Sequence, residues 1–124
     1  MEVTPVVAAG RQLIQAYRAG GFTVAGIRHE GSLLVMPERT FPWQVDTLSA
    51  ISVDSMAPVT AAEPAVELLI LGCGPSFAPA PPHLRDALRA HGIVVEAMTT
   101  PAACRTYNVL LAEDRRVAAA LIAV

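Results

Sequence analysis

Lysine is absent from the 124-residue sequence, and aromatic residues make up only 5% of it. All nine basic residues are arginines. Because the formal net charge is −2, the chain lacks the positive excess that neutralises nucleic-acid phosphates, and we expect no nucleic-acid binding. The hydrophobic share of 53% suffices for one core at this length. We predict a single globular domain over residues 1–124, in which residues 1–11 form a loosely ordered arm.

A long apolar helix is also lacking. The longest uncharged stretch, residues 68–84, contains four prolines, and prolines at this spacing prevent a continuous helix from crossing a bilayer. Glu2 stands where a signal peptide carries basic residues, and Arg11 soon interrupts any apolar segment. We therefore expect no membrane span and a cytoplasmic location.

Cysteine and histidine are too few and too scattered to indicate a metal site. Cys73 and Cys104 do not form a CxxC pair, and His29, His83 and His91 lack metal-ligand spacing. We predict two reduced, buried thiols, no metal and no cofactor. A thiol-redox pair stays open as an alternative if the fold brings the two Cα atoms within about 7 Å. Since no carboxylates are paired and no nucleophile motif is present, the sequence favours a non-enzymatic protein.

The N-terminal half has the pattern of a β-meander. Glycine and polar residues separate short apolar runs, which predicts strands over residues 13–17, 22–28 and 33–36, with a bulge accommodated at Gly26. Residues 41–45 predict a further strand that Pro42 confines to an edge or a strand start. A short helix is expected to open near Ser52 and to end before Pro58.

The C-terminal half predicts a β-α-β-α-β order. Leu84, Ala87, Leu88 and His91 recur at helical spacing, Pro82 suits the first turn of that helix, and Gly92 suits its end. Thr100 followed by Pro101 predicts the N-cap and first residue of a second helix. The expected elements are a strand at 66–71, a helix from Pro82 to Gly92, a strand at 93–97, a helix at 100–112 and a strand at 117–124.

The turn Gly72-Cys73-Gly74-Pro75 follows a buried strand, the position at which open α/β sheets place ligands. It matches neither a dinucleotide fingerprint nor a phosphate-binding loop, because Phe77 occupies the third glycine position and the chain has no lysine. If the two parallel-type strands are neighbours, this turn meets the helix start at Thr100, where backbone N–H groups can hold an anion. The predicted pocket comprises Gly72, Cys73, Gly74, Ser76, Thr100, Arg105 and Asn108.

A purely structural interpretation of the same residues is also open. The glycines of the turn would then permit a sharp exit from the sheet. Arg105 would pair with an acid such as Glu96, and Asn108 would hold a loop in place.

Three segments together resemble a small uncharacterised family that includes a mitochondrial assembly factor of respiratory complex I (NADH dehydrogenase) and an adipogenesis-associated protein. They are Leu69-Ile70-Leu71-Gly72-Cys73-Gly74, residues 92–100, and the stretch Ala103-Cys104-Arg105-Thr106-Tyr107-Asn108-Val109-Leu110. The resemblance covers about residues 13 to 123. It implies a three-layer β+α/β/α fold around a central mixed sheet, with the C-terminal strand antiparallel to the rest, and no established catalysis. The chain departs from relatives at Cys73, where threonine is common.

Two functions are therefore carried forward. The favoured one, motivated by the resemblance, is a non-enzymatic protein that binds an unidentified protein partner, as in respiratory-complex assembly, with a homo-oligomer also open. The alternative is a small-molecule or anion-binding domain, including an enzyme, whose site lies between the Gly72 turn and the Thr100 helix start.

Overall fold

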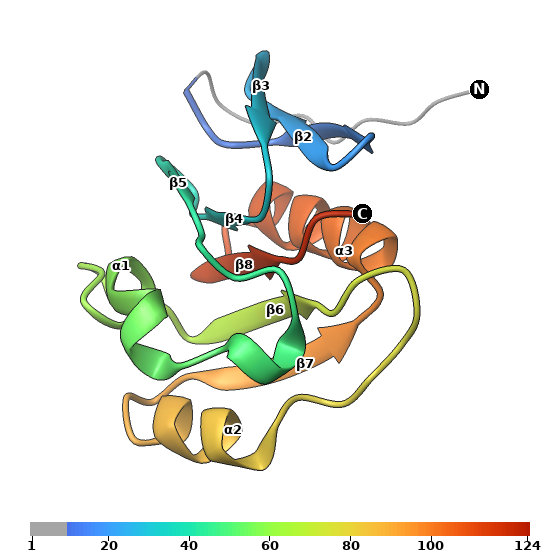
Figure 1. Cartoon of the computed structure of the whole chain (residues 1–124). Coiled ribbons are helices and arrows are strands. Elements are labelled where there is room, and N and C mark those ends of the chain that lie inside the picture. Colours follow the sequence, from blue (N-terminus) through green and yellow to red (C-terminus); the bar gives the residue numbers. More distant parts are fainter. Residues whose placement is uncertain (1–9) are drawn as a thin grey trace.

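The computed structural model describes residues 10–124, which form two β-sheets and three α-helices (Figure 1). The smaller sheet has the order β1-β2-β3 and the larger sheet the order β5-β4-β8-β6-β7. The strands are β1 (Ile14–Arg18), β2 (Gly21–Val24), β3 (Ile27–Glu30), β4 (Leu33–Val35), β5 (Thr40–Pro42), β6 (Leu68–Gly72), β7 (Val94–Met98) and β8 (Val117–Leu121). The helices are α1 (Ala57–Thr60), α2 (Pro82–Arg89) and α3 (Thr100–Ala112), with two 3₁₀ turns, η1 (Leu48–Ala50) and η2 (Val53–Met56).

The five-stranded sheet is covered on both faces, which gives the expected three layers. Along β6, Leu69 and Leu71 belong to one hydrophobic cluster while Ile70 belongs to the other, because successive side chains of a strand point to opposite faces. The first cluster includes α2 and the η2–α1 segment, and the second includes α3 and the three-stranded sheet. The predicted α/β class with a β+α/β/α arrangement is therefore confirmed.

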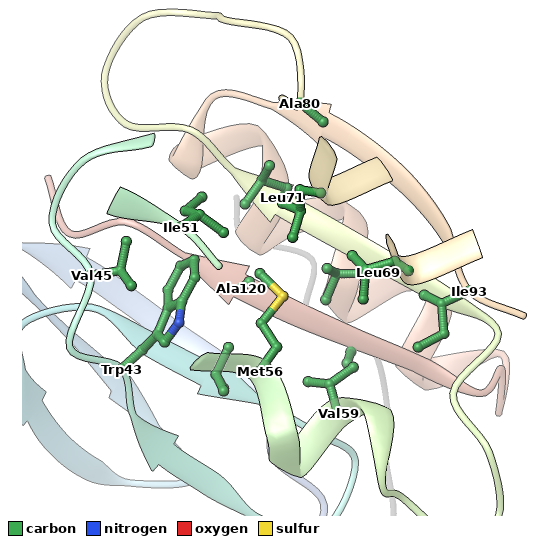
Figure 2. Packing of buried hydrophobic residues seen from close by; sticks show 14 of the residues in the cluster. Trp43, Val45, Ile51, Met56, Val59, Leu69, Leu71, Ala80, Ile93 and Ala120 are labelled. Carbon is green, nitrogen blue, oxygen red and sulfur yellow. The ribbon is translucent and has the colours of Figure 1, made fainter. Parts of the chain in front are cut away.

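The core under α2 and α1 contains one buried aromatic residue, Trp43, among mostly branched aliphatic side chains (Figure 2). Trp43 is 4% exposed and donates a hydrogen bond from its indole nitrogen to the Ser55 hydroxyl at 3.0 Å. That bond lets the indole lie in an apolar cluster without an unsatisfied N–H. Met56 and Val59 pack in the same cluster, and the Met56 side chain points toward Ala120 of the sheet.

The direction of the C-terminal strand corrects one expectation. β8 pairs in parallel with β6, and β6 in parallel with β7. The antiparallel strand is β4, which pairs with β8 on one side and β5 on the other. The implied antiparallel C-terminal strand is wrong because the α3 crossover returns the chain to the side from which it started, as βαβ units do.

A meander is present as β1-β2-β3, but residues 22–28 form two strands in place of one bulged strand, and the predicted strand at 33–36 is β4 of the five-stranded sheet. Ala25 and Gly26 have φ angles of 49° and 81° and turn the chain tightly between β2 and β3, as a two-residue hairpin requires. The bulge lies instead on β1, between Ile14 and Ala16.

Prolines lie at the starts of α1 and α2, and a glycine ends α2. Pro58 lies in the first turn of α1 rather than after a helix end, since proline is tolerated where N–H groups have no intrahelical partner. Pro82 begins α2 as predicted. After α2, Gly92 has φ of 77° and donates to the Arg89 carbonyl, while Ile93 donates to the Leu88 carbonyl, so the predicted glycine stop is a Schellman motif.

Within residues 10–124, no helix has the length and apolarity needed to cross a membrane. Most of the predicted N-terminal arm, residues 1–9, lies outside the described residues. At its end, the Arg11 guanidinium forms an ion pair with the Asp114 carboxylate at 3.1 Å.

Candidate functional site

The turn after β6 and the start of α3 do meet at one end of the five-stranded sheet. The Thr100 N–H donates to the Gly74 carbonyl at 2.9 Å, and the Gly74 N–H donates to the Thr100 hydroxyl at 2.9 Å. The Cys73 N–H donates to the Met98 carbonyl at 2.9 Å. The two segments are thus joined directly by backbone and hydroxyl groups.

Thr100 also reaches the residue that follows β8. Its hydroxyl, which accepts from Gly74, donates to the Ile122 carbonyl at 2.7 Å, and the side chain is fully buried. Since the Ile122 N–H donates to the Gly72 carbonyl at 3.0 Å, the ends of β6 and β8 and the start of α3 form one closed set of bonds. We call these four residues, Gly72, Gly74, Thr100 and Ile122, the Thr100 clip.

The N-cap of α3 is Thr99, one residue earlier than predicted. The Thr99 hydroxyl accepts from the Ala102 N–H at 3.4 Å, and Thr100 and Pro101 lie in the first helical turn. Threonine at either position has the same capping chemistry. The Thr100 hydroxyl is already engaged in the clip, so the neighbouring hydroxyl performs the capping.

Little space is left between Gly72 and the helix start. A Cβ at Gly72 would lie 3.0 Å from the Leu121 Cδ2, 3.0 Å from the Thr100 hydroxyl oxygen and 3.1 Å from the Thr100 Cα. Gly72 is therefore required for the close approach of β6 to α3, whereas Gly74 has φ of 106°, which other residues rarely adopt. These contacts agree with the structural interpretation of both glycines.

Cys73 and Ser76 organise the loop beyond the turn. The Cys73 thiol donates to the Ser76 carbonyl at 3.3 Å and accepts from the Ala78 N–H at 3.2 Å. The Ser76 side chain is exposed, and Phe77 beside it is 65% exposed. The buried thiol thus links two backbone groups of this loop.

Arg105 and Asn108, three residues apart on α3, lie in different surroundings. Arg105 is exposed, and among residues 10–124 it forms no ion pair with Glu96 or another acid. Asn108 binds the backbone of β1: its side-chain oxygen accepts from the Ile14 N–H at 2.9 Å, and its NH₂ donates to the Ile14 carbonyl at 2.7 Å. Asn108 therefore holds the small sheet against α3, and ligand binding at the predicted pocket stays a prediction.

The titratable groups near the clip are poorly suited to catalysis. Burial raises the pKa of Cys104 to about 12, and Arg105 only partly offsets this effect. A thiol with so high a pKa is neutral at physiological pH and is a weak nucleophile. Both cysteines are free, and His83 contacts the Ile51 carbonyl at 3.3 Å instead of a thiol. Within the described part of the chain, no three His, Cys, Asp or Glu residues cluster as metal ligands.

Two hollows lie away from this junction, and the sequence analysis missed both. One, of about 560 Å³, lies at the opposite end of the sheet and is lined by apolar side chains, arginines and carboxylates. The other, of about 260 Å³, lies between α2 and β7 and is lined by Arg85, Arg89, Ile93, Val94 and Val95. Segments far apart in the sequence form the first, so no local motif indicates it. The i, i+4 spacing of Arg85 and Arg89 was the available signal for the second.

Comparison with known proteins identifies relatives along nearly the whole chain. The model of a family described as protein of unknown function (DUF498/DUF598) matches residues 14–122. An uncharacterised protein of Rhodobacter capsulatus is 40% identical over 114 residues, which are 92% of this chain and 86% of that protein. NADH dehydrogenase [ubiquinone] 1 alpha subcomplex assembly factor 3 of Bos taurus is 36% identical over 109 residues, or 88% of this chain. The chain spans only 59% of the length of that bovine protein.

A solved structure confirms the fold. A crystal structure described as an outer membrane protein from Bartonella henselae superimposes with a TM-score of 0.85 at 37% identity. The match covers 94% of this chain and 98% of that one, so the same sheets and helices recur in a measured structure.

Proposed function

This chain belongs to the family of proteins of unknown function DUF498/DUF598, and we propose that it acts as a non-catalytic protein-binding domain in the assembly of a respiratory NADH dehydrogenase. The observation that carries the proposal is the 36% identity to a named assembly factor over 88% of the chain. We also propose that the chain works in the cytoplasm. Fractionation of cells that encode it, followed by immunoblotting, tests the location.

The chemistry of the predicted pocket supports binding in preference to catalysis. The hydroxyl of Thr100 and the amide of Asn108 are engaged with backbone groups, and the pKa of Cys104 is raised by burial. Residues with these roles stabilise a fold and leave its outer surfaces to bind partners. Arg105, which is exposed, is available to such a surface.

Deletion of the gene in the organism that encodes the chain tests the proposal. We expect less fully assembled NADH dehydrogenase on native gels, slower NADH oxidation by isolated membranes, and recovery of both when the wild-type chain is restored. Succinate oxidation by the same membranes is the control, because it bypasses this complex. Unchanged NADH dehydrogenase content and rate in the deletion strain would overturn the proposal.

A tagged chain purified under gentle conditions provides a second test. We expect it to retain a subunit or assembly intermediate of the NADH dehydrogenase, identified by mass spectrometry. The same purification from a strain that lacks the complex is the control, since its signal should disappear there. Equal recovery of all partners from both strains would contradict a role in this assembly.

A further inference from the structure

β7 is an unprotected edge of the five-stranded sheet. Within residues 10–124 it pairs only with β6, in parallel, over Val94–Met98. At one end of the pairing, the Val94 N–H donates a hydrogen bond to the Glu67 carbonyl. At the other end, the Met98 carbonyl accepts a hydrogen bond from the Cys73 N–H. Because inward and outward groups alternate along a strand, Val95 and Ala97 direct their N–H and C=O groups away from the sheet. None of these outward groups has a hydrogen-bond partner in residues 10–124.

The other edge of the same sheet, β5, is protected against the addition of another strand, whereas β7 is not. β5 has only three residues and ends in Pro42, and short length and proline both discourage the addition of another strand. β7 has five residues and no proline. The sheet can therefore be extended on the β7 side.

The charges along the β7 edge differ between its two faces. Val95 and Ala97 face the α2 cluster, and on this side Arg85 and Arg89 line the hollow of about 260 Å³ beside the strand. The ion pairs of the described residues involve other arginines. Glu96 is exposed and lies on the opposite face by strand alternation. The edge is thus basic on its α2 face and acidic at the centre of its α3 face.

A second copy of this chain fits the edge poorly. Antiparallel pairing of two β7 strands would bring the α2 helices of both copies to the same face, so Arg85 and Arg89 would approach their own counterparts. The same pairing centred on Glu96 would place two carboxylates opposite each other. Like charges directly opposite each other destabilise a pair of strands.

We propose that the free edge of β7 binds an extended segment of a partner protein as a sixth strand. The segment carries acidic side chains at alternate positions, toward Arg85 and Arg89, and a basic side chain on its other face, toward Glu96. Main-chain hydrogen bonds to Val95 and Ala97 supply affinity, and the alternating charges select the partner and its register. The inference deepens the proposed function by naming the class of partner.

Amide hydrogen exchange measured by NMR on the purified chain tests the geometry directly. In the free chain we expect the amides of Val95 and Ala97 to exchange quickly and those of Val94 and Glu96 to exchange slowly. The probe is a short synthetic peptide with glutamate at every second position. The positions between the glutamates hold valine, lysine and valine, in that order. On its addition, the Val95 and Ala97 amides should become protected, and N-methylation of alternate peptide amides should abolish the protection.

Charge reversal provides the matched control. The double variant Arg85→Glu with Arg89→Glu should bind the glutamate peptide about tenfold more weakly, and should regain binding to a peptide in which arginine replaces glutamate. Its urea midpoint should stay close to that of the wild type, because both side chains are exposed.

Three results would overturn the proposal. They are no protection of Val95 and Ala97 at millimolar peptide, equal affinity of the charge-reversed variant, and protection that rises with protein concentration alone, which would identify a second copy as the occupant. The purified chain is used throughout, so failure here leaves the outcome of the gene deletion unaffected. The two proposals can therefore fail separately.

Discussion

Replacement of Thr100 by valine tests whether the Thr100 clip stabilises the fold. Valine has nearly the same shape as threonine but has no hydroxyl, so Thr100→Val leaves the Gly74 N–H and the Ile122 carbonyl without their partner at a fully buried position. A buried polar group left unpaired costs about 1–3 kcal/mol. With two such groups, we expect the free energy of unfolding to fall by about 2–6 kcal/mol, which at this chain length lowers Tm by roughly 8–24 °C.

Urea unfolding followed by circular dichroism measures this loss, and Thr100→Ser is the matched control. Serine keeps the hydroxyl and loses one methyl group, so we expect it to cost only about 1 kcal/mol. If the valine variant is as stable as the serine variant, or more stable, the hydroxyl does not hold the strand ends together. The reasoning about the clip would then be refuted.

Three further changes probe other contacts. Asn108→Ala removes both hydrogen bonds to Ile14; we expect a loss of about 2 kcal/mol and faster amide exchange in β1, measured by NMR. Because burial raises the Cys104 pKa from 9.0 to about 12, the contribution of Cys104 to stability should be constant below pH 9 and fall above it, by up to about 1.4 kcal/mol per pH unit. Urea midpoints measured against pH check this, and Cys104→Ala should weaken the dependence. Gly72→Ala inserts a methyl group where Leu121 leaves 3.0 Å; we expect a loss of about 1–3 kcal/mol, seen as a lower Tm, and an unchanged Tm would contradict the crowding.

The sequence was most informative where each element carries its own boundary residues. Pro82 and Gly92 frame α2, and the apolar runs of β6 and β7 are bounded by glycine or polar residues, so their positions were predicted closely. The adjacent threonines at the start of α3 have equivalent capping chemistry. The N-cap was therefore displaced by one residue, because only the buried contacts of Thr100 distinguish the two.

Features that depend on contacts between distant segments were less predictable. Ala25 has no turn preference of its own, so the hairpin at Ala25-Gly26 looked like a bulge within one strand. The run Val117–Leu121 is buried throughout and has no residue that indicates its direction. The close approach of the Gly72 turn to α3 is fixed by hydrogen bonds that the sequence does not display.

The order of the five-stranded sheet has a consequence for folding during synthesis. β8 lies at the centre, between β4 and β6, yet it follows every other strand along the chain. As the chain leaves the ribosome, the β4–β5 hairpin and the β6–β7 pair emerge before the strand that joins them. Until β8 arrives, β4 and β6 each expose an open strand edge to the surrounding cell, and these edges are the places where another chain can pair. A nascent chain of this protein is thus most vulnerable to aggregation just before β8 emerges.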